Sequence, residues 1–461
     1  MEPQRLRTKA QRLRDNLAQS FDQTRQNFWK VQQHNIRTFR RQPLAEISGS
    51  FGDLGTLLPL MILLTEQHAI YLSSTLVFSG LANIATGVLF GIPLPVQPMK
   101  AIAAVAIAQR FSPQENASAG LFVAAVIGLL SITGLIHWLT RRVPVPVVKG
   151  IQVGTGLSLI SSAGKLYDSN DATPYILVIV FLGLLASASL KRIPYALILL
   201  VAGVIAVVVG EAAVRYPTAW PTFSIWKPRT FVPSSEAFAK GTLDAGIGQV
   251  PLTALNSVIA VTFLAADLLP EVPTPTATSI GLSVTCINLI GAWFGAMPVC
   301  HGSGGLAAQY RFGARSGSSI IFLGLVKFLL GLFAERIAEW LFVWFPKVLL
   351  LILVVAAGLE LVKVGESLNT DESLDLLPQD QERSKRSDLG IGGDKSASEL
   401  TIDERKQRWT VMAVTVAGIL AFHNDAIGFV AGMLCHWSFQ LHDRYEAHLQ
   451  SRRGPIQLGD D

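Results

Sequence analysis

Charged residues are scarce in this sequence. Asp, Glu, Lys and Arg make up only 15% of its 461 residues, while 50% are hydrophobic; soluble domains carry about 25% charged residues. The charges that are present concentrate in residues 1–43, 366–408 and 440–461, and between them lie apolar stretches long enough to cross a bilayer, such as 71–92, 118–140 and 193–210. The sequence therefore predicts an integral membrane protein, and excludes a cytosolic enzyme, a secreted disulfide scaffold and a nucleic-acid-binding protein.

Cysteines and catalytic motifs are also few. The three cysteines, Cys286, Cys300 and Cys435, lie in or beside apolar stretches and indicate no disulfide framework. The chain has no GxxxxGK[ST] phosphate loop, no HExxH motif and no Cys/His cluster. We therefore expect no enzyme activity, no ATP-driven transport by this chain alone, no cofactor and no protein-bound metal.

The first 43 residues contain no apolar signal-peptide core, and they carry ten Lys and Arg against three Asp and Glu. Two interpretations stay open for the stretch from Arg5 to Arg41: a polar helix or coil on anionic lipid headgroups, or a solvated cytoplasmic arm. The net charge of +5 fits Lys and Arg retained in cytoplasmic loops and does not call for a nucleic-acid partner.

The remaining chain divides into two sets of seven apolar elements, and we expect an all-α polytopic fold with about fourteen transmembrane elements. The expected domains are a basic cytoplasmic arm (1–43), a first seven-span repeat (44–211), an extracytoplasmic connection (212–237), a second repeat (238–439) that contains a disordered cytoplasmic loop (366–408), and a cytoplasmic tail (440–461). The expected spans are 45–66, 71–92, 93–111, 118–140, 144–164, 173–190 and 193–211, followed by 241–267, 275–295, 297–312, 317–333, 346–363 and a short hairpin of 409–422 and 425–439. Basic residues in alternate loops, among them Arg142, Arg192 and Arg315, predict that both termini are cytoplasmic.

The two halves resemble each other around two interrupted elements. The stretch Gly91–Ala104 and the stretch Gly295–Ala308 both begin with Gly, continue through Pro-Val and polar residues, and end in an Ala-rich helix start. Since each half has an odd number of spans, the second half is expected to insert upside down relative to the first. Inverted repeats with paired broken helices are typical of secondary transporters, whose binding site lies near the bilayer midplane.

These two interruptions are the strongest candidate for a binding site. Three prolines at 93, 95 and 98 prevent a regular helix before Met99, and glycines at 302, 304 and 305 have the same effect in the second half. Each half-helix then presents free N–H groups and the positive end of its dipole inside the protein, which suits an oxyanion. The alternative is that Pro and Gly only kink packed helices. The glycines would also let a ligand approach the backbone.

Several polar side chains lie at these breaks. A lysine near the bilayer centre is costly, so Lys100 is expected to be an anion ligand or an ion-pair partner of Asp53. Asp53 is an acid in an apolar span and is a candidate proton carrier, as is His301. Further hydrogen-bond donors for an oxyanion are Gln97, Gln249, His301 and Ser303. For each of these donors, helix–helix hydrogen bonding is the alternative.

Four motifs stand out in the apolar part of the chain: FGDLGTLLPL (51–60), PVQPMKAIAAVA (95–106), QVPLTALNSVIAV (249–261) and HGSGGLAAQYRFGARSG (301–317). They resemble the eukaryotic molybdate transporter family of fungi, plants and algae, a distant branch of the SulP sulfate transporters, and the resemblance spans about residues 44–362. It implies a core domain and a gate domain, with an anion site between the third and tenth half-helices that touches the first and eighth spans. The positions that carry over are Gly52, Asp53, Gln97, Met99, Lys100, Gln249, His301, Gly302, Ser303 and Gly304. The resemblance also implies a homodimer. Typical SulP proteins end in a soluble STAS domain, and none is expected here because about twenty residues follow Phe439.

Together these features predict a secondary transporter that imports molybdate by alternating access, coupled to protons through Asp53 or His301. Molybdenum would be bound only as the oxyanion substrate. Three alternatives stay open: a carrier of sulfate or another tetrahedral oxyanion, a non-transporting oxyanion sensor, and a channel. The membrane, whether the plasma membrane or the vacuolar or another endomembrane, is not fixed by any sorting signal.

Overall fold

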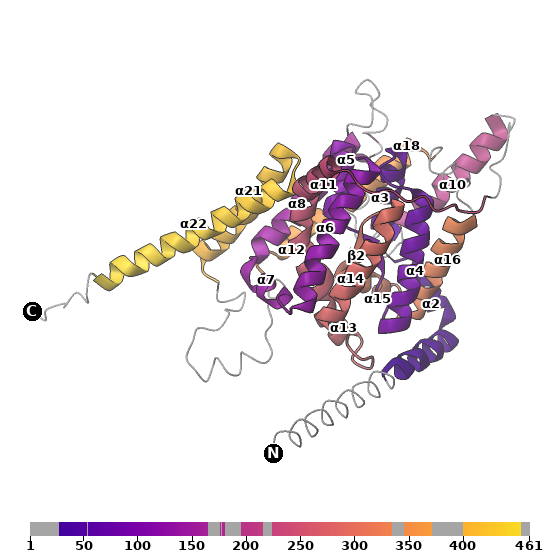
Figure 1. The fold of residues 1–461 in the computed structure, drawn as a ribbon, viewed down its shortest axis with the longest axis horizontal. Helices are drawn as coiled ribbons and strands as arrows, with labels where there is room; N and C mark the ends of the chain where they lie inside the picture. Colours follow the sequence, from indigo (N-terminus) through magenta and orange to yellow (C-terminus); the bar gives the residue numbers. More distant parts are fainter. Residues whose placement is uncertain are drawn as a thin grey trace, which may run out of the picture.

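The computed structural model describes residues 27–52, 54–164, 176, 178–179, 195–214, 224–333, 345–370 and 400–452. Within them the chain is a bundle of helices with one two-stranded sheet near its centre (Figure 1). Five helical stretches are long and apolar enough to cross a membrane, which agrees with the low charge of the sequence: Leu72–Phe90, Pro113–Ile132, Ser235–Leu268, Ala277–Phe294 and Lys347–Ser367.

The elements of the first half follow the expected order. Residues 27–41 are helical, and they precede α2 (Pro43–Ser50), α3 (Leu54–Glu66), α4 (Leu72–Phe90), β1 (Val96–Pro98), α5 (Lys100–Gln109), α6 (Pro113–Ile132), α7 (Ile136–Arg142), α8 (Val145–Gly164) and α10 (Tyr195–Val214). The expected span 173–190 lies outside the described residues except at positions 176, 178 and 179.

Two expected spans of this half are interrupted. The span 45–66 is divided between α2 and α3 by a turn at Phe51 and Gly52. The span 118–140 begins earlier, at Pro113, where Ser112 forms a capping box with Glu115. It then breaks between α6 and α7, where Gly134 has a φ of +73°. Apolar composition alone could not show these breaks, because both neighbouring segments are hydrophobic.

The second half of the described chain again places a short strand between two sets of helices. Its elements are α11 (Ser235–Gly241), η2 (Thr242–Gly246), α12 (Ile247–Leu252), η3 (Thr253–Ile259), α13 (Ala260–Leu268), α14 (Ala277–Gly291), η4 (Ala292–Phe294), β2 (Val299–His301), α15 (Ser303–Arg311), α16 (Ser318–Phe333), α18 (Lys347–Lys363), η5 (Val364–Ser367), α21 (Ile402–Phe422) and α22 (Asp425–Arg452). The stretch from α11 to α13 is one continuous helix with two π-helical segments, η2 and η3, on either side of Pro251. π-Helical segments of this kind are frequent at functional sites.

The last two helices correct the expected half-length hairpin. Helix α21 has 21 residues and α22 has 28; the two lie side by side, and α22 extends beyond the bundle toward the C-terminus (Figure 1). The extra length is polar and was therefore not part of the hydrophobic signal. Of the segment 366–408, the structure describes both ends: η5 reaches Ser367, and α21 begins at Ile402 with a capping box of Thr401 and Glu404. Residues 371–399 lie outside the described part of the chain.

Helices of the two halves pack against each other around the sheet. Helix α4 packs along α16, α6 along α14, and α8 against both α18 and α21. Glycines allow the first of these contacts, since a Cβ on Gly80 would lie 2.7 Å from the carbonyl oxygen of Gly324. Close contact of backbones through small residues is typical of helix pairs in membranes. The packing therefore places β1 and β2 inside the bundle, where all six of their residues are buried.

Candidate functional site

The two interrupted elements meet in a short antiparallel ladder. Val96 is paired with His301, Gln97 with Cys300, and Pro98 with Val299, and the N–H of Met99 extends the pairing by donating to the carbonyl oxygen of Pro298 at 2.9 Å. Because the strands are antiparallel, α5 leaves the ladder at one end and α15 leaves it at the other. The positive N-terminal ends of both helices therefore lie against the same small sheet, and their first-turn N–H groups have no partner within their own helices.

Each strand is fixed by an asparagine of the preceding helix. The N–H of Val96 donates to Oδ1 of Asn83 on α4 at 2.7 Å. Correspondingly, the N–H of Val299 donates to Oδ1 of Asn288 on α14 at 2.8 Å, and Nδ2 of Asn288 donates back to the Val299 carbonyl oxygen at 2.6 Å. Both asparagine side chains are buried. These bonds satisfy backbone groups that the short ladder leaves without partners in an apolar interior.

The N-terminal turn of α15 is the accessible part of this arrangement. Gly302 and Ser303 are half-buried and Gly304 is exposed. Apart from its chain neighbours and the backbone of α15, no described atom lies within 4 Å of the position that a Cβ on Gly304 would occupy. By contrast, a Cβ on Gly302 would lie 2.4 Å from Oε1 of Gln97, and one on Gly305 would collide with the same side chain. Glycine is therefore required where Gln97 packs on the start of α15.

The start of α5 is held by the neighbouring continuous helix. Oε1 of Gln249 accepts the N–H of Ala101 at 3.1 Å, and Nε2 of Gln249 donates to Oγ1 of Thr253 at 3.0 Å. Gln249 thus has partners for both of its amide atoms, and it fixes the turn that begins at Lys100. Lys100 is half-buried, whereas Met99, which precedes it, is fully buried.

The other expected residues are not part of this accessible turn. His301 is 0% exposed, and its Nε2 lies 3.0 Å from Oγ of Ser283 on α14. Its ring meets that of Phe90 edge-on, with centroids 6.2 Å apart. Gly52 lies against the middle of α15, where a Cβ would be 2.9 Å from the carbonyl oxygen of Ala308. Asp53 lies outside the described residues.

One charged residue at the ladder was not identified from the sequence. Lys327 lies within the apolar helix α16 and is buried, and its Nζ is 3.5 Å from the carbonyl oxygen of Val96. A lysine in the middle of an otherwise apolar span is a strong sequence signal. Lys327 lies in sequence outside the two breaks at which the other polar residues are found. Lys327 brings a second positive charge, besides Lys100, to the region of the strand pair.

Solved structures with a similar arrangement of helices include a bicarbonate transporter and SLC26A9. The transmembrane domain of a cyanobacterium bicarbonate transporter, BicA, superposes with a TM-score of 0.55, covering 84% of this chain and 97% of that one at 14% identity. The overall structure of SLC26A9 also gives 0.55, covering 86% of this chain and 65% of that one at 12% identity. At these identities the likeness shows the fold alone, which is that of SulP and SLC26-type membrane proteins.

Similarity in sequence identifies the family of the chain, which similarity in fold does not. The chain is 39% identical to Molybdate transporter 2 of Arabidopsis thaliana, covering 72% of this chain and 81% of that protein. It is 31% identical to Molybdate transporter 1 of Chlamydomonas reinhardtii, covering 89% and 94%. The profile described as "Molybdate transporter of MFS superfamily" matches residues 45–159 and 241–361, the two stretches that carry the strand pair and its supporting helices. The chain therefore belongs to the molybdate transporter family and is an anion transporter of the SulP and SLC26-type fold.

Proposed function

We propose that this chain imports molybdate across its membrane by alternating access. The observation that carries the proposal is the strand pair β1–β2, which brings the positive N-termini of α5 and α15 to the two ends of one small buried sheet in a member of this family. Helix N-termini suit a tetrahedral oxyanion, since backbone N–H groups donate to its oxygens and the dipole attracts its charge. Neither the backbone N–H groups nor the positive end of a helix dipole attracts a cation.

The proposed ligands lie around the first turns of these two helices. The exposed start of α15, from Gly302 to Gly304, supplies backbone donors, and Ser303 adds a hydroxyl. Lys100 supplies positive charge at the start of α5, supported by Lys327 beyond the ladder. Gln97, Met99 and Gln249 hold the two half-helices in place, so we assign them to the walls of the site together with Gly52 and His301.

An inverted repeat accounts for the packing of the two halves. In such a repeat α4 corresponds to α14 and α6 to α16. The contact between α4 and α16 then has an equivalent in the contact between α14 and α6, and both contacts are present. The asparagines Asn83 and Asn288 correspond in the same way, each accepting the N–H of a strand valine. These equivalences support fourteen elements in two inverted sets, with a core that moves past a gate domain.

The orientation and the driving force belong to the same proposal. Basic loops on the side of the N-terminal helix favour cytoplasmic termini. Import of a dianion against an inside-negative potential costs about 2.3 kcal/mol per charge per 100 mV, so accumulation requires a coupled cation. We propose protons as that cation, carried by Asp53 or by His301.

Molybdate uptake by cells that lack endogenous molybdate and sulfate carriers tests the function. We expect saturable uptake of labelled molybdate that persists in an equimolar amount of sulfate. Transport of sulfate itself, together with full competition between the two anions, would assign the chain to sulfate. Binding of molybdate without any uptake would indicate a sensor, and uptake that does not saturate would indicate a channel.

A further inference from the structure

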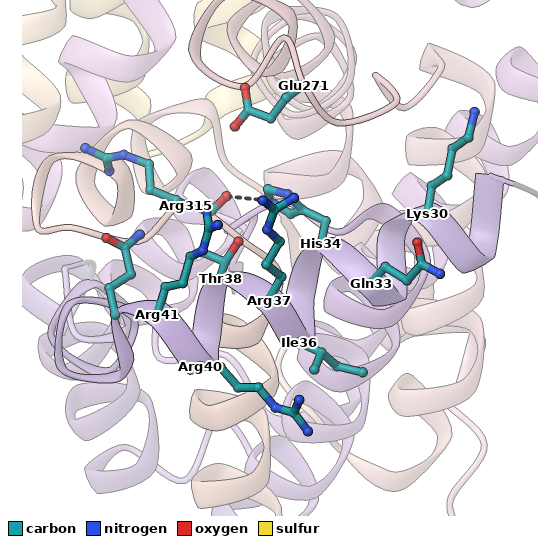
Figure 2. Close-up of a pocket in the computed structure, with 11 residues that line it drawn as sticks. Lys30, Gln33, His34, Ile36, Arg37, Thr38, Arg40, Arg41, Glu271 and Arg315 are labelled. Atoms are coloured by element: carbon teal, nitrogen blue, oxygen red, sulfur yellow. Dashed lines mark hydrogen bonds between the residues drawn. The ribbon is translucent and has the colours of Figure 1, made fainter.

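The helix of residues 27–41 borders a large opening lined by basic side chains. The opening has a volume of about 1060 Å³ and lies between this helix, the loop from α13 to α14, and the loop from α15 to α16. Lys30, Arg37, Arg40 and Arg41 line it, and Glu271 is the carboxylate among the lining residues. In Figure 2, Arg37 and Arg41 extend from the helix into the opening, and Glu271 lies across it.

The loop from α15 to α16 brings no negative side chain to this opening. Arg315, which also borders it, is turned away: its guanidinium lies 3.6 Å from the centroid of the Tyr310 ring, and Nη1 donates to the carbonyl oxygen of Ala314 at 2.7 Å. Its backbone carbonyl is instead bound by His34, whose Nε2 lies 3.1 Å away (Figure 2). A group with negative charge is therefore the chemically matched occupant of the space around Arg37 and Arg41.

The helix is fixed to the ends of two helices of the bundle. Nε2 of Gln32 donates to the carbonyl oxygen of Val88 at 2.6 Å, near the end of α4. Asn35 is buried, and it donates to the Gly87 carbonyl oxygen at 3.0 Å and accepts the N–H of Gly317, just before α16, at 2.9 Å. Since α4 is a membrane-crossing helix by length and composition, these bonds hold the helix of residues 27–41 at the level where α4 leaves the hydrocarbon.

The exposed side of the same helix is both basic and apolar. Lys30, Arg37 and Arg41 follow the helical spacing i, i+7, i+11. Beside them Trp29 is 56% exposed and Ile36 is 54% exposed, and Leu44, which follows on α2, is 80% exposed. Large apolar side chains next to Lys and Arg are typical of helices that lie in the membrane interface, and tryptophan prefers that position. A soluble anion would match the arginines but would leave Trp29 and Ile36 in water.

We propose that this opening binds the phosphate headgroup of an anionic phospholipid, with Trp29 and Ile36 inserted among the acyl chains beside it. Arg37 and Arg41 donate to the phosphate oxygens, since guanidinium groups bind phosphate through paired N–H donors. Lys30 and Arg40, which also line the opening, add positive charge to it. The bound lipid would tie the helix, and with it α4 and α16, to one leaflet. This inference does not depend on which anion the chain transports.

Lipid binding by the purified full-length protein tests the proposal. The protein in a mild neutral detergent is titrated with phosphatidylserine, phosphatidylcholine or inorganic phosphate, and the midpoint of thermal unfolding is followed. We expect phosphatidylserine to raise the midpoint of the wild-type protein at micromolar concentrations, and the other two to have no effect there. Each basic residue near the surface contributes about a fivefold gain in affinity for anionic lipid. The double variant Arg37→Gln/Arg41→Gln is therefore expected to need roughly thirtyfold more phosphatidylserine.

Three further variants make the test specific. Lys227→Gln/Arg229→Gln removes the same charge from exposed positions of the segment before α11, and it is expected to respond like wild type. Arg37→Lys/Arg41→Lys keeps both positive charges and is expected to keep most of the response, and a cooperative unfolding transition of the glutamine variant without lipid shows that this variant is folded. Trp29→Ser/Ile36→Ser is expected to weaken the effect of long-chain lipid. The proposal is overturned if the glutamine variant responds like wild type, if inorganic phosphate reproduces the effect, or if the serine variant responds unchanged.

Discussion

The side-chain oxygen of Gln249 accepts the backbone N–H of Ala101 from 148 positions away in the sequence, at 3.1 Å. This bond joins the continuous helix α11–α13 to the first turn of α5. It means that Gln249 occupies one of the N–H donors that a bound anion would otherwise use. The geometry therefore separates two kinds of residue at the site, those that hold the half-helices and those that face open space.

Replacement of Lys100 by Ala is expected to abolish or severely weaken uptake. Lys100 is the charged side chain at the start of α5 and is half-buried. A cation inside the membrane is costly unless a negative charge, here the bound anion, pairs with it. Uptake kinetics with measured membrane abundance check this, with exposed Lys227→Ala as the control for loss of a lysine. A normal Km and rate for Lys100→Ala would remove Lys100 from the site.

Ser303→Ala and Gln249→Ala are expected to behave differently. Ser303 lies in the open first turn of α15, so loss of one hydrogen bond to the anion should raise the Km about five- to a hundredfold, equivalent to roughly 1–3 kcal/mol, with unfolding unchanged. Gln249→Ala also leaves the Ala101 N–H and Thr253 without their partner, so it should lower both affinity and the thermal midpoint. Calorimetry with molybdate and a thermal melt separate the two effects. Wild-type affinity in both variants would place the anion elsewhere.

The two strand-holding asparagines should be essential for stability. Asn83→Ala leaves the buried N–H of Val96 without its acceptor, and Asn288→Ala removes both bonds to Val299. An unsatisfied buried group costs about 1–3 kcal/mol, so we expect Asn288→Ala to lower stability more than Asn83→Ala. Ser279→Ala, which removes only a side-chain bond to the carbonyl oxygen of Thr276 at the start of α14, serves as the control. Equal melting of Asn288→Ala and wild type would show that the strands are held by the ladder alone.

Removal of the charge of Asp425 is expected to stabilise the folded protein. It is buried at the start of α22, and a Cβ on Gly248 of α12 would lie 2.4 Å from its own Cβ. Neither carboxylate oxygen has a hydrogen-bond partner in the described part of the chain. Burial of an ionised group without a partner is costly, so Asp425→Asn is expected to raise the thermal midpoint at neutral pH. A lower midpoint, with Asp443→Asn as the exposed control, would mean that the carboxylate has a role as an anion.

The sequence predicted those parts of the fold that depend on local chemistry. Three prolines before Met99 and the glycines after His301 were sufficient to place both helix starts, and α5 and α15 begin within one residue of Met99 and Gly302. The strand pair was not predictable in this way. Its three-residue strands are too short for any alternation, and Val96 meets its partner His301 only when segments about two hundred residues apart come together.

The same distinction applies to the site. Lys100, Gln97 and Ser303 stand out because polar residues at a break in an apolar element are costly without a function. Two contacts depend instead on the rotation of each helix and strand about its axis. They are the contact of Lys327 with the Val96 carbonyl oxygen and that of His301 with Ser283. Hydropathy does not fix that rotation. The polar second half of α22 was missed for a related reason, since an apolar pattern ends where the helix leaves the lipid.

Proton coupling gives the last prediction. Two negative charges cost roughly 4.6 kcal/mol per 100 mV of inside-negative potential, so accumulation of molybdate from trace levels needs co-transported cations. Two protons for each molybdate would make transport electroneutral, and more than two would make it inward-driven by the potential. Uptake is therefore expected to rise as the external pH falls, and Asp53→Asn should flatten that dependence while sparing binding. Vesicles that contain the reconstituted protein, with an imposed pH gradient at fixed voltage and without sodium, provide the measurement. His301→Gln is the matched variant, because it removes the other candidate carrier from a position that is buried against Ser283. If molybdate accumulates equally with and without the gradient, the chain works as a facilitator or an exchanger, and neither residue carries a coupled proton.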